Sequence, residues 1–155
     1  MINKGSQYLL WSDSQVQKIQ ISAAKTPTNE TLRKLKTGDF ISGEGHISGS
    51  KVTFKKIENV GLKKILGAWV SPTKEKYFFQ DFNVLKLIPP NDTLNDKALT
   101  FSYSILPAKG KGWQIVFLSD NNVQVGRLIK KDLTYTIQIL SQKTGSVLRE
   151  INLRR

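Results

Sequence analysis

Apolar and polar residues alternate through most of this chain, and in its second half the centres of the alternating segments lie roughly 10–12 residues apart. Side chains of a strand point alternately to its two faces, so this period predicts strands rather than helices. Evenly spaced strands joined by short turns are typical of an antiparallel meander or sandwich. In the second half the predicted strands are Leu99–Leu106, Trp113–Leu118, Val123–Ile129, Tyr135–Leu140 and Val147–Leu153.

The first half has the features of a small, strongly curved barrel. A predicted hairpin covers residues 40–57 and turns at Ser48-Gly49-Ser50. Gly43 and Gly45 occupy alternate positions of its first strand, which indicates a bend, a bulge or the close approach of another backbone. These features favour an OB-like or SH3-like barrel in an all-β protein.

One short helix interrupts the strands near residues 28–36. Thr28 or Asn29 is its predicted N-cap, because a side-chain oxygen there can accept a hydrogen bond from the first helical turn. Gly38 is the predicted C-terminal stop. The predicted class is therefore all-β with a single helix.

Pro89-Pro90 divides the chain, because two prolines cannot continue a helix or an inner strand. The predicted halves are a barrel-like part over 1–90 and a meander over 91–155. A length of 155 residues suits one ordinary domain, so the halves are either two small domains or parts of one compact domain.

The composition excludes several classes of site. The chain has no cysteine, which rules out disulfides, thiolate metal sites and cysteine nucleophiles. His46 is its one histidine, which rules out a multi-histidine metal site within a single chain. No phosphate-binding glycine motif opens a helix. We therefore expect no catalytic residues, no cofactor and no metal.

No stretch of the sequence has the roughly 18 consecutive apolar residues of a membrane-spanning helix. The N-terminal apolar patch is too short for a signal peptide. We expect a soluble protein of the cytoplasm; a periplasmic or secreted protein is the alternative if a signal peptide has been removed.

Positive charge is the feature that most favours a function. The chain carries 24 Lys and Arg against 12 Asp and Glu, a net charge of +12. The segment from Arg33 to Lys64 contains eight basic residues and three acidic ones. Basic barrels bind nucleic acid by neutralising phosphates, and aromatic rings beside the charge stack on bases. The predicted nucleic-acid-binding residues are Lys51, Lys55, Lys56, Lys63 and Lys64, with Trp69 or Tyr77 as the stacking ring.

In a second interpretation, the positive charge is spread over the whole chain and does not mark a specific site. Basic residues also occur in the second half, in the loop 109–112 and at Arg149, Arg154 and Arg155. A diffuse charge suits an acidic protein partner or a membrane surface. The alternative function is therefore a protein–protein interaction or assembly domain, exported or membrane-associated, with an apolar strand such as 113–118 making the contact.

An enzyme is the least favoured class. Glu44 and His46 share a face of a predicted strand, and a carboxylate beside an imidazole can orient it as a general base. An exposed histidine next to an exposed glutamate is the favoured explanation, because no serine nucleophile or oxyanion loop can be tied to the pair. Asp81 lies inside an apolar run and needs either a partner or solvent on its face.

Overall fold

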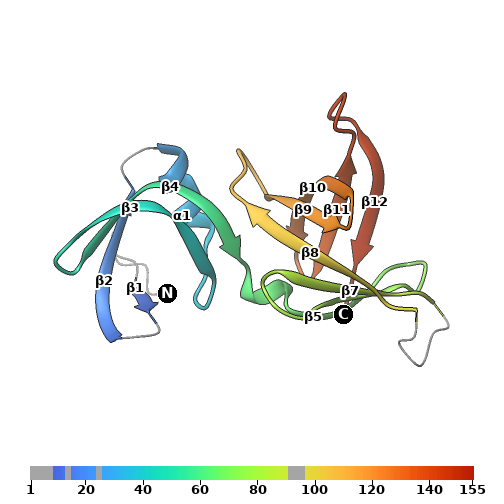
Figure 1. The fold of residues 1–155 in the computed structure, drawn as a ribbon, viewed down its shortest axis with the longest axis horizontal. Coiled ribbons are helices and arrows are strands. Elements are labelled where there is room, and N and C mark those ends of the chain that lie inside the picture. Colours follow the sequence, from blue (N-terminus) through green and yellow to red (C-terminus); the bar gives the residue numbers. More distant parts are fainter. Residues whose placement is uncertain (1–8, 13–14, 24–25, 91–96) are drawn as a thin grey trace. The chain divides into compact units, whose positions relative to one another are not determined.

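The computed structural model describes residues 9–12, 15–23, 26–90 and 97–155 (Figure 1). The described chain consists mostly of strands, with a single short α-helix and a nearly closed, antiparallel, barrel-shaped sheet. This confirms the predicted all-β class. The chain divides between Leu62 and Lys63 into two compact units. That residues 1–90 and 91–155 are separate domains stays a prediction.

The first unit is a small sheet with the helix against it. Strands β1 and β2 pair in antiparallel fashion, β2 pairs in parallel with β4, and β3 and β4 form an antiparallel hairpin. The elements are β1 (Leu9–Ser12), β2 (Gln15–Ala23), α1 (Thr26–Lys34), β3 (Phe40–Ser48) and β4 (Lys51–Gly61).

Helix α1 packs on β2 and β4. Leu32 and Leu35 are buried, as are Val52 and Phe54 on the inner face of β4. The helix begins at Thr26, so the predicted cap at Thr28 or Asn29 is wrong. The Thr28 hydroxyl instead lies within the helix and donates a 3.3 Å hydrogen bond to the Lys55 carbonyl oxygen, which ties α1 to β4.

The β3–β4 hairpin curves where its glycines lie. Its register shifts twice, between Ser42 and Gly43 and between Glu44 and Gly45. A Cβ atom built on Gly43 would lie 2.1 Å from the Lys56 carbonyl oxygen, a distance that no side chain can occupy. The predicted bulge and close backbone approach are therefore confirmed.

The second unit contains eight strands in one antiparallel meander, and each strand pairs with the next along the chain. The five strands predicted in the second half are all present. The elements are η1 (Lys63–Ile65), β5 (Gly67–Val70), β6 (Lys76–Phe79), β7 (Val84–Ile88), β8 (Leu99–Leu106), β9 (Trp113–Ser119), β10 (Asn122–Lys131), β11 (Thr134–Leu140) and β12 (Val147–Leu153).

The meander closes where its last strand returns to its first. Val70 and Arg154 form an antiparallel bridge, with N–H···O distances of 2.8 Å and 3.1 Å in the two directions. The Arg155 guanidinium donates a 2.8 Å hydrogen bond to the Leu66 carbonyl oxygen and lies 4.8 Å from the centre of the Trp69 ring. We call this junction of β5 with β12 the seam.

Large side chains fill the barrel, as expected for about eight strands. Trp69 meets Tyr135 edge-on, and Phe79 meets Tyr103 in the same way; both pairs have ring centres 5.1 Å apart. The other buried side chains of the interior include Ile65, Tyr77, Leu85, Ile105, Trp113, Ile115, Phe117, Leu128, Ile137, Ile151 and Leu153.

We predict that Gly43→Ala destabilises the first unit by about 2 kcal/mol, because the methyl group must displace the β4 backbone. Gly45→Ala should cost less, since its Cβ would lie 2.7 Å from the nearest backbone oxygen rather than 2.1 Å. Urea unfolding of the two variants checks this order. Equal stability of Gly43→Ala and the parent would contradict the close approach.

Candidate functional site

The predicted lysines of the first unit lie on the β3–β4 hairpin. Lys51, Lys55 and Lys56 are all exposed. Phe54 pairs with Gly45 and Lys56 pairs with Glu44, so Lys55 is the extra residue of a bulge. The bulge interrupts the alternation and lets two successive lysines reach solvent before the strand turns inward again.

Lys56 is partly compensated by carboxylates. Its ammonium lies 3.0 Å from a Glu58 carboxylate oxygen. The hydrogen bond to Glu58, the charge of Glu58 and, to a lesser extent, the charge of Glu44 raise the pKa of Lys56 above its ordinary value. Lys56 therefore stays charged, and nearby carboxylates of the chain partly neutralise that charge.

Lys63 and Lys64 lie in the second unit, on the short helix η1, and both are exposed. The Arg155 guanidinium donates a 3.4 Å hydrogen bond to the Lys64 carbonyl oxygen. The five predicted lysines thus divide between the units, three on the hairpin and two beside the seam.

The two predicted stacking rings lie inside the barrel. Trp69 is 3% exposed and Tyr77 is 4% exposed. The Trp69 indole N–H donates a 2.7 Å hydrogen bond to the Ile65 carbonyl oxygen, which holds the ring in the interior. Neither ring offers a face to a base, so stacking on Trp69 or Tyr77 has no support.

The residues considered for catalysis are on the surface. Glu44 and His46 are exposed on β3, where Glu44 lies opposite Lys56 and His46 lies opposite Thr53. Asp81 is exposed in the turn after β6. Solvent, one of the two environments expected for a carboxylate within this apolar run, therefore surrounds it. Its carbonyl oxygen accepts a 2.5 Å hydrogen bond from the Tyr103 hydroxyl.

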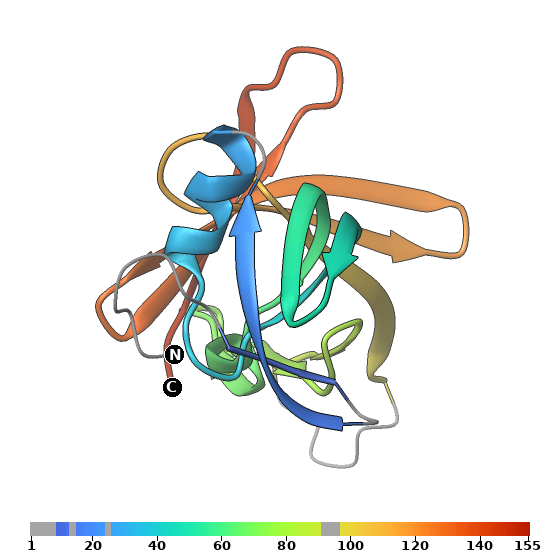
Figure 2. The ribbon, with the colours of Figure 1, turned by 90° about the vertical axis from the view of Figure 1, so that its left-hand side faces the viewer.

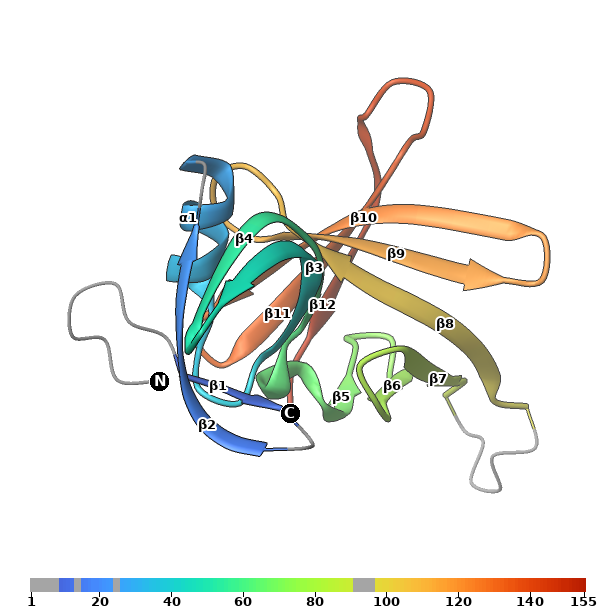
Figure 3. The ribbon, with the colours of Figure 1, turned by 60° about the vertical axis from the view of Figure 1, so that its left-hand side comes forward.

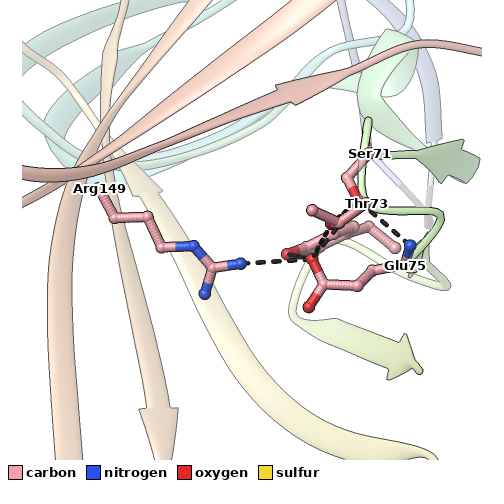
Figure 4. Close-up of polar contacts among 5 residues, drawn as sticks. Ser71, Thr73, Glu75 and Arg149 are labelled. Carbon is pink, nitrogen blue, oxygen red and sulfur yellow. Dashed lines mark hydrogen bonds and ion pairs between the residues drawn. The ribbon is translucent and has the colours of Figure 1, made fainter. Parts of the chain in front are cut away.

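A polar cluster at the barrel wall was not predicted (Figure 4). Glu75 Oε2 accepts a 2.9 Å hydrogen bond from the Thr73 hydroxyl and longer ones from Ser71 and Tyr77. The Arg149 guanidinium lies 3.3 Å from the same oxygen. The cluster joins the β5–β6 turn to β12 and so forms a second, side-chain fastening along the seam.

The sequence alone does not predict the Glu75 cluster, and the reason is physical. Ser71, Thr73 and Glu75 are close in sequence and indicate only a turn. Arg149 lies 74 residues from Glu75. Only closure of the barrel brings the two together, and no local pattern records that closure.

Comparison of the chain with protein-family models, with curated proteins and with solved structures gives no match. Within the part of the chain that the structure describes, no group of three or more His, Cys, Asp or Glu side chains is placed to hold a metal ion. No described helix is both long and apolar enough to cross a membrane.

Glu75→Gln should destabilise the barrel by about 1 kcal/mol, because it removes the charge that pairs with Arg149 at a partly buried position. The matched control is Glu58→Gln, which removes the exposed ion pair with Lys56 and should change stability by less than about 0.5 kcal/mol. Urea unfolding measures both variants. Equal losses would show that Glu75 contributes no more to stability than an exposed ion pair does.

Burial, followed by the negative charge of Glu75, raises the pKa of Tyr77 from 10.0 to about 12. The folded protein thus keeps a proton that the unfolded chain releases, so stability is full below pH 10 and falls between pH 10 and about 12. We predict a shallower fall for Tyr77→Phe, measured by urea unfolding at successive alkaline pH values. Burial raises the pKa of Tyr103 as well, so some fall should persist. Identical profiles for parent and variant would contradict this assignment.

Proposed function

We propose that this chain is a non-enzymatic β binding module that contacts nucleic-acid phosphates with little sequence specificity. The observation that supports it is the exposure of all five predicted lysines in a chain of net charge +12. Lysines on a surface release condensed counterions from phosphates, whatever the base sequence.

The hairpin lysines differ in what they can contribute. Lys56 shares its charge with Glu58 at 3.0 Å, and a phosphate must compete with that carboxylate. Lys51 lies beyond the bulge, near the turn of the hairpin, and Lys55 projects from the bulge itself. We therefore expect Lys51 and Lys55 to contribute more to the affinity than Lys56.

A protein-interaction module is the second candidate, favoured by apolar side chains on the outer face of the barrel. Leu118 pairs with Val123 across β9 and β10, and the two side chains are 43% and 45% exposed. Val147, at the start of β12, is 51% exposed. Under this alternative the basic surface would attract an acidic protein partner, and the apolar face would make the contact.

Titration of labelled single- and double-stranded oligonucleotides across a range of salt concentrations tests the proposed function. We predict micromolar or tighter binding near physiological salt, with a steep fall in affinity as salt rises. Binding seen only at very low salt would contradict the proposal and favour the protein partner.

The double variant Lys55→Glu, Lys56→Glu should weaken oligonucleotide binding. Each lost phosphate contact costs about fivefold at 0.1 M salt on a single strand. Of the single variants, Lys55→Glu should bind the oligonucleotide more weakly than Lys56→Glu, because Lys56 already forms an ion pair with Glu58. Unchanged affinity of the double variant would remove the hairpin from the binding surface.

A further inference from the structure

The order of the strands determines which connections lie together. In an antiparallel meander, successive connections alternate between the two ends of the strands. Closure at Val70 and Arg154 turns these two ends into the two rims of a barrel. One rim therefore collects η1, the β6–β7 turn, the β8–β9 loop, the β10–β11 turn and the residues that follow β12. Figures 2 and 3 show the β9–β10 and β11–β12 turns away from the C-terminus, at the opposite end.

Contacts within the second unit link these segments in a series. Trp113 pairs with Leu128, which sets the β8–β9 loop beside the end of β10. Tyr135 pairs with Leu153, which sets the β10–β11 turn beside Arg154. The hydrogen bond from Arg155 to the Lys64 carbonyl oxygen then joins the chain after β12 to η1.

Basic residues concentrate at this rim. Residues 63–64, 109–111, 130–131 and 154–155, which we call the basic rim, supply eight Lys and Arg side chains, and all eight are exposed. Two acidic residues, Asp81 and Asp132, lie in the same connections, so the side chains give a net charge of +6. The described turns at the opposite end hold three lysines and two acidic residues, and Lys76 lies beside them at the start of β6, which gives a net charge of +2.

An aromatic ring accompanies the charge. Phe82, in the β6–β7 turn of the same rim, is 37% exposed, in contrast to the buried Trp69 and Tyr77. Proteins that bind single strands combine a basic track for the backbone with exposed rings on which bases stack. Every base has a ring face, so this arrangement does not depend on sequence.

We propose that the basic rim is a binding site for single-stranded nucleic acid, with its lysines and arginines on the phosphates and Phe82 against a base. The inference rests on the proposed function and locates its main contact surface on the barrel. Lys63 and Lys64 belong to this surface, and the loop 109–112 and Arg154 and Arg155 extend it around the barrel end.

The test compares two triple variants that change the charge by the same amount. The rim variant is Lys109→Glu, Lys111→Glu, Lys131→Glu, none of which belongs to the five lysines of the proposed function. The control is Lys74→Glu, Lys97→Glu, Lys143→Glu, in three connections of the opposite end. The probe is a labelled oligothymidine, with thermal unfolding to verify that each variant is folded.

For the rim variant we expect the salt slope to fall by about 2 and the affinity at 0.1 M salt to fall by about 100-fold, as the loss of three contacts on a single strand requires. The control should lose much less. A Lys→Gln version of the rim triple, which lacks the added repulsion, carries the same test if the glutamates prevent folding.

The outcomes separate this inference from the proposed function. If the parent protein binds no oligonucleotide, or binds only anionic lipid vesicles, the proposed function itself fails. If the parent binds but the rim and control variants lose affinity equally, binding follows overall charge and the rim inference fails. It fails likewise if only a Lys51, Lys55, Lys56 triple variant loses binding.

Phe82→Ala distinguishes a single strand from a mere polyanion. We expect about tenfold weaker binding of oligothymidine, because a stacked base is lost, and unchanged binding of heparin, which has no bases. Equal effects on the two probes would overturn the role of Phe82.

Discussion

The backbone bridge between Val70 and Arg154 organises the second unit. Without it, β5 and β12 would be the two open edges of an eight-stranded sheet, each with unpaired backbone groups. With it, the sheet encloses Trp69, Tyr103 and their neighbours, and the interior becomes a packed core. Arg149, paired with Glu75, and Arg155 fasten the same seam by their side chains, and Arg154 does so by its backbone.

The sequence was most informative where structure is local. Period-two patterns located the five strands after residue 98 and the curved hairpin, because alternation and turn chemistry act within a few residues. Gly43 and Gly45 indicated the bulges for the same reason, since only glycine tolerates the β4 backbone at that distance. The cap at Thr28 or Asn29 failed because the helix begins earlier, at Thr26, so both residues lie inside it, and the Thr28 hydroxyl donates to the Lys55 carbonyl oxygen.

Closure and burial were out of reach of these local patterns. Tyr77 follows Lys76 in the sequence and Trp69 follows Lys64 by five residues, yet both rings are buried, because the closed sheet encloses the face on which they lie. The Glu75–Arg149 pair joins residues 74 apart. The basic rim has the same origin: its four segments are scattered from residue 63 to residue 155, and only a closed meander gathers them at one end. Counted along the sequence, the basic residues of these segments are dispersed over the second unit.

Closure thus connects the fold to the proposed activity, since the inferred basic rim and its exposed Phe82 depend on it. The most direct test is an NMR map of backbone amide shifts during titration with oligothymidine. We predict that the largest changes fall in residues 63–66, 80–83, 107–112, 130–134 and 154–155. Changes confined to the β3–β4 hairpin, or to the β9–β10 and β11–β12 turns at the opposite end, would contradict it.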